Sequence, residues 1–268
     1  LIEQYQPYFP QTFTTYYEPF LGGGAVFFYL AQQHPSLPAI LTDINPELIN
    51  AYCCVRDRVE ELILLLQEHQ LEHTNHEQKY YYWVRSHSYK TDIEKAARLI
   101  YLNKTCYNGL YRENSKGEFN VPIGRYKNPN ICQPDLLRSV SSVLKPAQIH
   151  VRKFDRVLDF ANSSEDFVYF DPPYYPIGST SNFTAYSREN FKESEQIQLR
   201  DVFAELTERR VKVIQSNSQC AFIENLYSDE AAFKVDRLPK LRQISASRGI
   251  NSNAGKRGKV SEFLIISV

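Results

Sequence analysis

Near the middle of the chain the sequence reads Phe167-Val168-Tyr169-Phe170-Asp171-Pro172-Pro173-Tyr174. Four apolar residues after a polar stretch are typical of a buried strand, and the residues that follow predict a loop at its carboxyl end. The two prolines stiffen this loop, because each fixes its own φ and restricts the preceding residue to extended conformations. The sequence therefore predicts a rigid bracket that holds a carboxylate, bare carbonyl groups and an aromatic ring at the edge of a sheet.

Such a bracket suits chemistry on an exocyclic amine, although these four loop residues alone fit a rigid turn without function equally well. The amino nitrogen of adenine or cytosine is a weak nucleophile because its lone pair is delocalised into the ring. Hydrogen bonds from the amine to Asp171 and to the Pro172 carbonyl would localise that lone pair, and Tyr174 could stack on the base. Asp171, Pro172 and Tyr174 are therefore the candidate catalytic residues.

A second motif lies near the N-terminus, where residues 13–17 predict a strand and residues 25–33 a helix. Between them stands Glu18-Pro19-Phe20-Leu21-Gly22-Gly23-Gly24, and its glycines let a ligand approach the backbone. Their spacing fits neither the dinucleotide fingerprint nor the phosphate loop. Asp43 ends the next predicted strand, where an acid binds ribose hydroxyls; a helix N-cap before Pro46 is the alternative. A ribose ligand without a phosphate cradle fits S-adenosylmethionine.

These motifs and their order resemble the Dam-type DNA adenine N6-methyltransferases, the D12 class with alpha motif order. The resemblance rests on residues 18–24, Thr42-Asp43-Ile44-Asn45 and residues 171–174, and it spans nearly the whole chain. It implies an α/β fold, a Rossmann-like S-adenosylmethionine-dependent methyltransferase sheet with an inserted, mostly helical target-recognition domain carrying a β-hairpin. We expect residues 1–50 and 146–268 to form the catalytic domain and residues 51–145 the insertion.

The resemblance also assigns the cofactor site. Phe154 follows a predicted strand at residues 148–152, where the family places an aromatic residue against the cofactor adenine; a core phenylalanine is the serious alternative. The expected cofactor-binding residues are Glu18, Phe20, Gly22, Gly24, Asp43, Phe154 and Asp171. The family's Lys-Trp-Ala-Gly-Gly-Lys-type segment is missing ahead of the first strand, so we expect either a chain that begins downstream of its natural start or weaker cofactor binding.

Residues 103–127 interleave basic and aromatic side chains, and their Asn-Gly and Lys-Gly dipeptides predict hairpin turns. This composition suits a groove reader but fits a solvated hairpin equally well. The resemblance makes it the recognition hairpin for duplex GATC. It implies guanine reading by Arg112, thymine-methyl contacts by Leu110 and Pro122, intercalation by Tyr107, an approach of Asn108 to the space left by the flipped adenine, and flanking contacts by Arg125 and Tyr126.

Two polar loops complete the predicted DNA surface. Residues 175–186 resemble the family's segment over the flipped base, in which Ser179 and Thr184 are candidates for phosphate contacts. Residues 248–259 hold four basic residues and no acid, which suits phosphate binding by Asn253, Lys256 and Arg257. A charged surface loop is the alternative for the second segment.

Composition bounds this interpretation. The chain has 31 Lys and Arg against 31 Asp and Glu, so any DNA-binding surface must be local. Five cysteines without a C-x-x-C motif indicate a reducing, cytoplasmic setting without structural zinc. His69, His73 and His76 lie at helical spacing on what we expect to be a solvated face, and without acidic or cysteine partners they predict no metal site. No apolar run is long enough to span a membrane, and no signal peptide is evident.

The sequence therefore predicts a monomeric, site-specific enzyme that binds double-stranded DNA and methylates N6 of a flipped adenine without a metal. Asp171 in place of serine favours adenine over cytosine N4, and the absence of a Pro-Cys dipeptide disfavours cytosine C5. A DNA-binding relic with weak turnover and an RNA adenine methyltransferase are the alternatives, although the narrow major groove of duplex RNA argues against the latter. A dinucleotide oxidoreductase would leave residues 171–174 unexplained.

Overall fold

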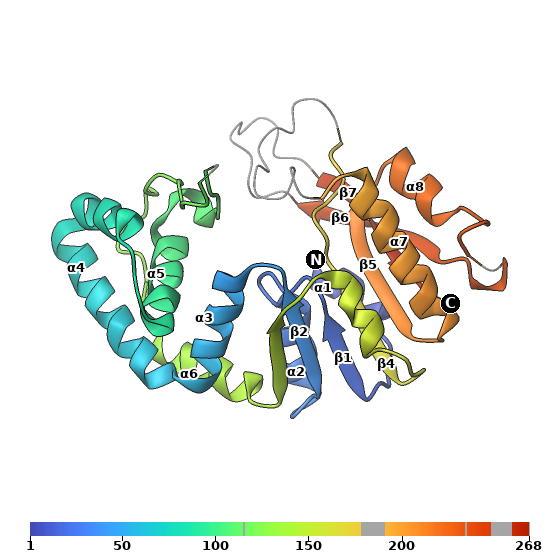
Figure 1. The fold of residues 1–268 in the computed structure, drawn as a ribbon, viewed down its shortest axis with the longest axis horizontal. Coiled ribbons are helices and arrows are strands. Elements are labelled where there is room, and N and C mark those ends of the chain that lie inside the picture. The colour runs from blue at the N-terminus through green and yellow to red at the C-terminus, as the bar shows by residue number, and fades with distance from the viewer. Residues whose placement is uncertain (115, 178–190, 234, 248–258, 268) are drawn as a thin grey trace. The chain divides into compact units, whose positions relative to one another are not determined.

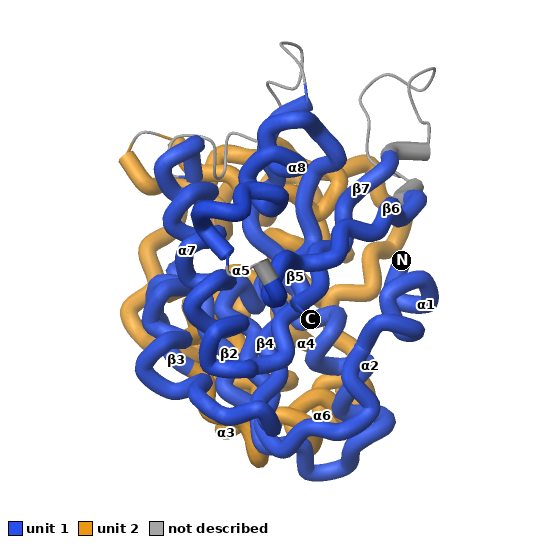
Figure 2. Tube along the Cα trace, turned by 90° about the vertical axis from the view of Figure 1, so that its right-hand side faces the viewer, with its two compact units in different colours: residues 1–44, 150–268 blue, residues 45–149 orange. Residues whose placement is uncertain are grey.

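The structure is a computed structural model that describes residues 1–114, 116–177, 191–233, 235–247 and 259–267. The chain divides into two compact units, residues 1–44 with 150–268 and residues 45–149 (Figure 2). The predicted insertion, residues 51–145, falls within the second unit, which begins before it and ends after it.

The first unit is organised by a seven-stranded sheet in the order β3-β2-β1-β4-β5-β7-β6 (Figure 1). β1 pairs in parallel with β2 and β4, and β4 pairs in parallel with β5, whereas β7 runs antiparallel to both β5 and β6. The strands are β1 (Thr15–Glu18), β2 (Ala39–Asp43), β3 (Ala147–Val151), β4 (Asp166–Phe170), β5 (Lys212–Ser218), β6 (Lys240–Ser247) and β7 (Lys259–Ile266). The predicted Rossmann-like sheet is confirmed.

β4 occupies the centre of the parallel part, and all five of its residues are buried, which explains its continuous apolar run. Helix α7 (Glu193–Glu208) packs Leu199, Val202 and Phe203 into the core beneath it. The remaining helices of this unit are α1 (Ile2–Tyr5), α2 (Ala25–Gln33) and α8 (Ala221–Tyr227), with short 3-10 turns η1 (Gln6–Tyr8), η3 (Phe154–Asp159) and η4 (Val235–Arg237). Because parallel strands end at one edge, the loops after β1 and β4 meet there.

The second unit is mostly helical. It contains α3 (Pro46–Asp57), α4 (Val59–Ser86), α5 (Asp92–Thr105), the short turn η2 (Tyr107–Gly109) and α6 (Pro134–Leu144). Arg58 has non-helical angles (φ −133°, ψ 37°) and separates α3 from α4. α3 starts where Asn45 Oδ1 accepts from the Glu47 and Leu48 amides at 2.9 and 3.2 Å, with Pro46 in the first turn.

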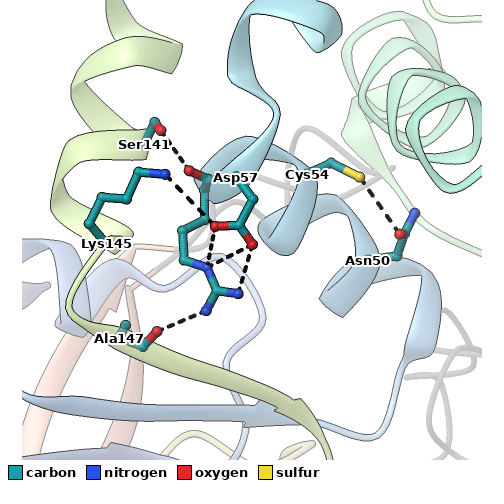
Figure 3. Close-up of polar contacts among 7 residues, drawn as sticks. Asn50, Cys54, Asp57, Ser141, Lys145 and Ala147 are labelled. Atoms are coloured by element: carbon teal, nitrogen blue, oxygen red, sulfur yellow. Dashed lines mark hydrogen bonds and ion pairs between the residues drawn. The ribbon is translucent and has the colours of Figure 1, made fainter.

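Polar contacts tie the end of α3 to α6 and to the start of β3 (Figure 3). Arg56 donates to the Ala147 carbonyl at 2.9 Å, and its own carbonyl accepts from Ser141 Oγ at 3.0 Å. Asp57 pairs with Arg56 at 2.8 Å and with Lys145 at 3.8 Å, and the Arg56 hydrogen bond lowers the pKa of Asp57. These contacts join the first helix of the second unit to its last helix and to the strand through which the chain leaves it.

The solvated face expected for the α4 histidines is wrong for His69 and His73, whereas His76 is exposed as expected. His69 and His73 are buried, and their Nδ1 atoms lie 2.7 Å from the Tyr80 hydroxyl and 2.9 Å from the Tyr101 hydroxyl. Tyrosine rings cover these imidazoles while their hydroxyls satisfy them, and burial lowers the pKa of His69 to about 4. Within the described residues, no cluster of His, Cys, Asp and Glu could hold a metal ion, and no helix is long and apolar enough to cross a membrane.

Candidate active site

A cavity of about 560 Å³ in the first unit opens at the carboxyl edge of β1 and β4. Its lining includes Tyr5, Glu18, Gly23, Gly24, Tyr169 and Asp171. Of the predicted cofactor residues, Glu18, Gly24 and Asp171 line it, whereas Phe20, Gly22, Asp43 and Phe154 lie beyond its lining. Two carboxylates from adjacent strands therefore share one concave site.

The glycine turn after β1 needs glycine for its backbone and leaves open space in front of it. Gly22 and Gly24 have φ of +45° and +63°, in the left-handed region that side chains disfavour. A Cβ built on Gly22 or Gly23 would meet no heavy atom within 4 Å. The Leu21 amide donates to the Thr42 carbonyl at 3.0 Å and ties the turn to β2. A ligand can thus lie against this backbone.

Asp43, at the end of β2, supports the same turn. Its Oδ2 accepts from the Gly22 amide at 3.1 Å. The alternative role for Asp43, a cap of the following helix, is wrong because the α3 cap is Asn45. A contact between Asp43 and ribose stays a prediction.

Glu18 is a buried carboxylate at the end of β1, 2% exposed. Its Oε2 accepts from the Tyr16 hydroxyl at 2.8 Å and from the Phe27 amide at 3.0 Å, near the start of α2. Burial raises its pKa to about 8, and the nearby Asp171 charge adds to this rise against the two hydrogen bonds. Glu18 therefore changes its protonation state near neutral pH.

Asp171 directly follows β4 and is accessible from the cavity. Protein atoms crowd the rest of the carboxylate, so desolvation raises its pKa, although hydrogen bonds from Ser216 and Tyr174 oppose that rise. Ser216 Oγ on β5 donates to Asp171 Oδ1 at 2.6 Å. This bond fixes the orientation of the carboxylate at the cavity edge.

Tyr174 is fixed through its hydroxyl, which donates to Glu262 Oε2 on β7 at 3.2 Å. The Tyr5 hydroxyl from α1 reaches the same oxygen at 3.4 Å. Burial raises the pKa of Tyr174, so this hydroxyl stays protonated as a donor. Stacking of the Tyr174 ring on a base stays a prediction.

Phe20 and Phe154 lie together near the glycine turn. Their rings stack at 5.3 Å, and both contact Phe191. Phe154 is 9% exposed and belongs to the core around α7, which matches the core role named as its alternative. A contact of either ring with the cofactor stays a prediction.

The expected recognition hairpin lies in the second unit. Antiparallel bridges join Cys106 to Ile123 and Glu113 to Phe119, and the Asn120 amide donates to the Arg112 carbonyl at 2.9 Å. The described residues between 105 and 124 form these isolated bridges in place of continuous strands. The predicted DNA contacts Tyr107, Asn108, Leu110, Arg112, Pro122, Arg125 and Tyr126 are all exposed.

Two features fix the hairpin geometry. Arg112 Nε donates to Asn120 Oδ1 at 2.6 Å and its Nη2 to the Asn120 carbonyl at 3.3 Å, so the guanidinium is held across the hairpin. A Cβ on Gly124 would lie 2.8 Å from the Cys106 carbonyl and 2.4 Å from the Tyr126 ring, which explains the glycine there. Of the remaining predicted contacts, Ser179, Thr184, Asn253, Lys256 and Arg257 lie outside the described residues.

Comparison with known proteins identifies the family of this chain. Residues 1–241 match the D12 class N6 adenine-specific DNA methyltransferases. The chain belongs to this family. It is similar to the type II methyltransferase M1.LlaDCHI of Lactococcus lactis subsp. cremoris, with 39% identity over 99% of this chain and 90% of that protein. It is also similar to M.MjaIII of Methanocaldococcus jannaschii, with 40% identity over 94% and 88%.

The DNA adenine methylase of Escherichia coli K12 is 33% identical over 93% of this chain and 84% of that protein. Among solved structures, the rRNA methyltransferase AviRa of Streptomyces viridochromogenes has a TM-score of 0.36 at 13% identity, over 99% of this chain and 81% of that chain; a similarity this weak has no bearing on substrate. The protein is thus an adenine-specific DNA methyltransferase, and family membership implies that it uses S-adenosylmethionine.

The cavity of this D12 methyltransferase fits that cofactor. Its volume, its open glycine backbone and its two carboxylates suit a ligand that carries a ribose, an ammonium and a sulfonium group. Three residues of the site, Tyr5, Ser216 and Glu262, were not predicted from the sequence. A buried acid inside an apolar strand is rare, so the position of Glu262 in the sequence could have marked it as a candidate site residue.

Proposed function

We propose that this methyltransferase transfers a methyl group from S-adenosylmethionine to N6 of an adenine flipped out of duplex GATC. The accessible but desolvated Asp171 carboxylate at the cavity edge is the observation that supports this most strongly. An amine inside the base stack cannot reach an oxygen recessed in a cavity, so the base must leave the duplex.

Asp171 and Pro172 activate the amine in this proposal. With one Asp171 oxygen held by Ser216, the other accepts a hydrogen bond from N6, and the Pro172 carbonyl accepts a second. Both bonds draw the lone pair out of the ring and onto N6, while Tyr174, tied to Glu262, holds the base plane. When bound, S-adenosylmethionine supplies a methyl group made electrophilic by its sulfonium centre.

We assign the cofactor to Glu18, Phe20, Gly22, Gly24, Asp43 and Phe154, with Asp171 shared between cofactor and base. The turn backbone gives close approach, and Asp43, already braced against Gly22, faces the ribose. The Asp171 carboxylate places negative charge where the ligand carries positive charge, and Glu18 adds a buried carboxyl group to the same cavity. No metal takes part in this proposal.

Specificity for GATC rests on the hairpin. The two bonds from Arg112 to Asn120 use Nε and one Nη2 hydrogen, which leaves Nη1 and the other Nη2 hydrogen for bidentate contact with guanine O6 and N7. Leu110 and Pro122 offer exposed apolar surface to a thymine methyl, and Tyr107 an exposed ring for insertion into the stack. We place the enzyme on double-stranded DNA inside the cell, acting as a monomer.

The test measures methyl transfer from labelled S-adenosylmethionine to two duplexes that differ only in GATC versus GTAC. Transfer confined to GATC is the expected result, and a GATC duplex already carrying N6-methyladenine on both strands serves as the blank. Equal transfer to both duplexes would overturn the assignment of the hairpin but not the enzyme class. Transfer to GATC in duplex RNA would favour the RNA alternative.

A further inference from the structure

We infer that Gln196 and Asn217 form a buried amide relay that positions the catalytic loop. Both side chains are fully buried at 0% exposure, Gln196 on α7 and Asn217 on β5. The inference rests on the proposed role of Asp171, Pro172 and Tyr174, since it names the residues that fix their geometry. Gln196 and Asn217 are positioning residues, because they contact the loop backbone and not the reacting atoms.

In the relay every donor points the same way, from the Tyr175 and Ser218 amides towards the Pro173 carbonyl. Gln196 Nε2 donates to the Pro173 carbonyl at 2.9 Å, and Gln196 Oε1 accepts from Asn217 Nδ2 at 3.0 Å. Asn217 Oδ1 then accepts from the backbone amides of Tyr175 and Ser218 at 3.2 and 2.8 Å. A backbone carbonyl at one end and two backbone amides at the other allow a single orientation of both side-chain amides, because a flip would oppose two donors or two acceptors.

The loop needs such support because its sequence removes its own donors. Pro172 and Pro173 have no N–H, so between Asp171 and Tyr175 the backbone can be tied only through carbonyl groups and through the amides of Tyr174 and Tyr175. The relay uses one group on each side of Tyr174, the Pro173 carbonyl and the Tyr175 amide. Tyr174 is thereby bracketed, and the relay does not use the Pro172 carbonyl, which the proposed function assigns to the substrate amine.

Burial makes the relay stiff. A buried amide without a hydrogen-bond partner carries the full free-energy cost of its desolvation. Each of the two side chains is therefore stable only while the other side chain and the loop backbone keep their positions. A displacement of about 1 Å at reacting groups lowers a rate about a hundredfold. We therefore expect loss of the relay to lower kcat while leaving the affinity for S-adenosylmethionine nearly unchanged.

The experiment compares Gln196→Met, which keeps the length of the side chain and removes the amide, with Gln215→Met as its matched control. Gln215 is an equally buried amide on β5 whose Oε1 accepts from the Tyr227 hydroxyl on α8 and whose Nε2 has no hydrogen-bond partner among the described residues, so its amide takes no part in the relay. The measurements are single-turnover methyl transfer on a GATC duplex at saturating S-adenosylmethionine, the Kd of S-adenosylmethionine, and thermal unfolding. We expect Gln196→Met to lower the rate about tenfold or more, and Gln215→Met to lower it less than about twofold at a similar loss of Tm.

Equal rates in the two variants would overturn the relay. Asn217→Asp gives a second test if Gln196→Met does not fold: the ionised carboxylate cannot donate to Gln196 Oε1, but the protonated acid can. Its rate relative to wild type should therefore rise as pH falls, and a constant ratio would contradict the inference. Asp171→Ala separates the two proposals, because an active Asp171→Ala enzyme would refute the catalytic assignment, whereas an inactive one beside a fully active Gln196→Met would refute the relay alone.

Discussion

The catalytic loop and the recognition hairpin use polar residues in opposite ways. The loop at residues 171–175 is tied to buried side chains on three elements, Ser216 and Asn217 on β5, Gln196 on α7 and Glu262 on β7. The side chains of the hairpin that we expect to contact DNA are exposed, and its backbone is held by isolated bridges, by the two Arg112–Asn120 hydrogen bonds and by Tyr81 and Arg85, which donate to the Val121 carbonyl. Chemistry requires groups fixed before the substrate arrives, whereas reading a groove requires groups that remain exposed to meet it. Changes in the loop should therefore be close to all-or-none, and changes in the hairpin graded.

The largest effect is expected at Asp171. Asp171→Ala should lower methyl transfer at least about a thousandfold, because the amine loses the acceptor that activates it, while the affinities for S-adenosylmethionine and DNA stay near wild type. Filter binding measures the two affinities, and single-turnover transfer measures the rate. Asp166→Asn is the matched control: Asp166 is buried at the opposite end of β4 and accepts from the Asn162 and Ser163 amides, so its loss should lower Tm but not kcat.

Loss of binding together with transfer in Asp171→Ala would indicate a folding role instead. In the wild-type enzyme, the raised pKa of Asp171 means that the carboxylate is protonated, and activity lost, at a higher pH than for an ordinary aspartate. The rate should fall as pH decreases through that raised pKa.

A graded effect is expected at Arg112. Arg112→Ala should lower discrimination against a changed guanine about tenfold to a hundredfold, the value of one bidentate base contact, while transfer to altered sites is lowered much less. Competition between GATC and guanine-substituted duplexes measures the ratio. Arg138→Ala on α6, whose guanidinium pairs with Glu60 at 2.7 Å, should leave the ratio unchanged. A lower rate with intact discrimination would show that Arg112 does not read a base.

The desolvation of the cavity should itself be measurable at Glu18. Because its folded pKa is about 8 against an ordinary value of 4.5, the free energy of unfolding should fall as pH rises from 4.5 to 8 and then level off. The contribution is at most about 1.4 kcal/mol per pH unit. Glu18→Gln, whose carbonyl can still accept from Tyr16 and Phe27, should flatten this fall in urea titrations at several pH values. Parallel profiles for variant and wild type would contradict a buried, ionisable Glu18.

Much of the first unit followed from local pattern. The apolar run of β4 predicted a buried strand, since burial on both faces of a parallel strand leaves a direct record in the sequence, and the motif order, through the family resemblance, implied the sheet. The glycine turn was equally visible because its backbone angles at Gly22 and Gly24 demand glycine.

Long-range partners could not be predicted in this way. Gln196 and Asn217 are 21 residues apart, and nothing in either neighbourhood shows that they meet behind the loop. His69 and His73 were misplaced for the same reason: polar neighbours in sequence suggested solvent, while the tyrosine that covers them, Tyr101, comes from another helix. Such contacts depend on tertiary packing, which the local sequence does not record.

The smallest expected effect concerns the thymine methyl in the hairpin's target. Replacing the thymine of GATC by deoxyuridine removes one methyl group, whose contact with Leu110 and Pro122 is worth about 0.8 kcal/mol, or about fourfold in kcat/KM. In Leu110→Ala the same replacement should have a smaller effect, because part of the contact is already gone. Leu136→Ala, at another exposed leucine, on α6, should show the full wild-type penalty. An unchanged deoxyuridine penalty in Leu110→Ala would show that the hairpin does not read the methyl group through this residue. If Leu110→Ala itself lowered the rate as much as Asp171→Ala does, the hairpin would be as tightly coupled to the chemical step as the loop is.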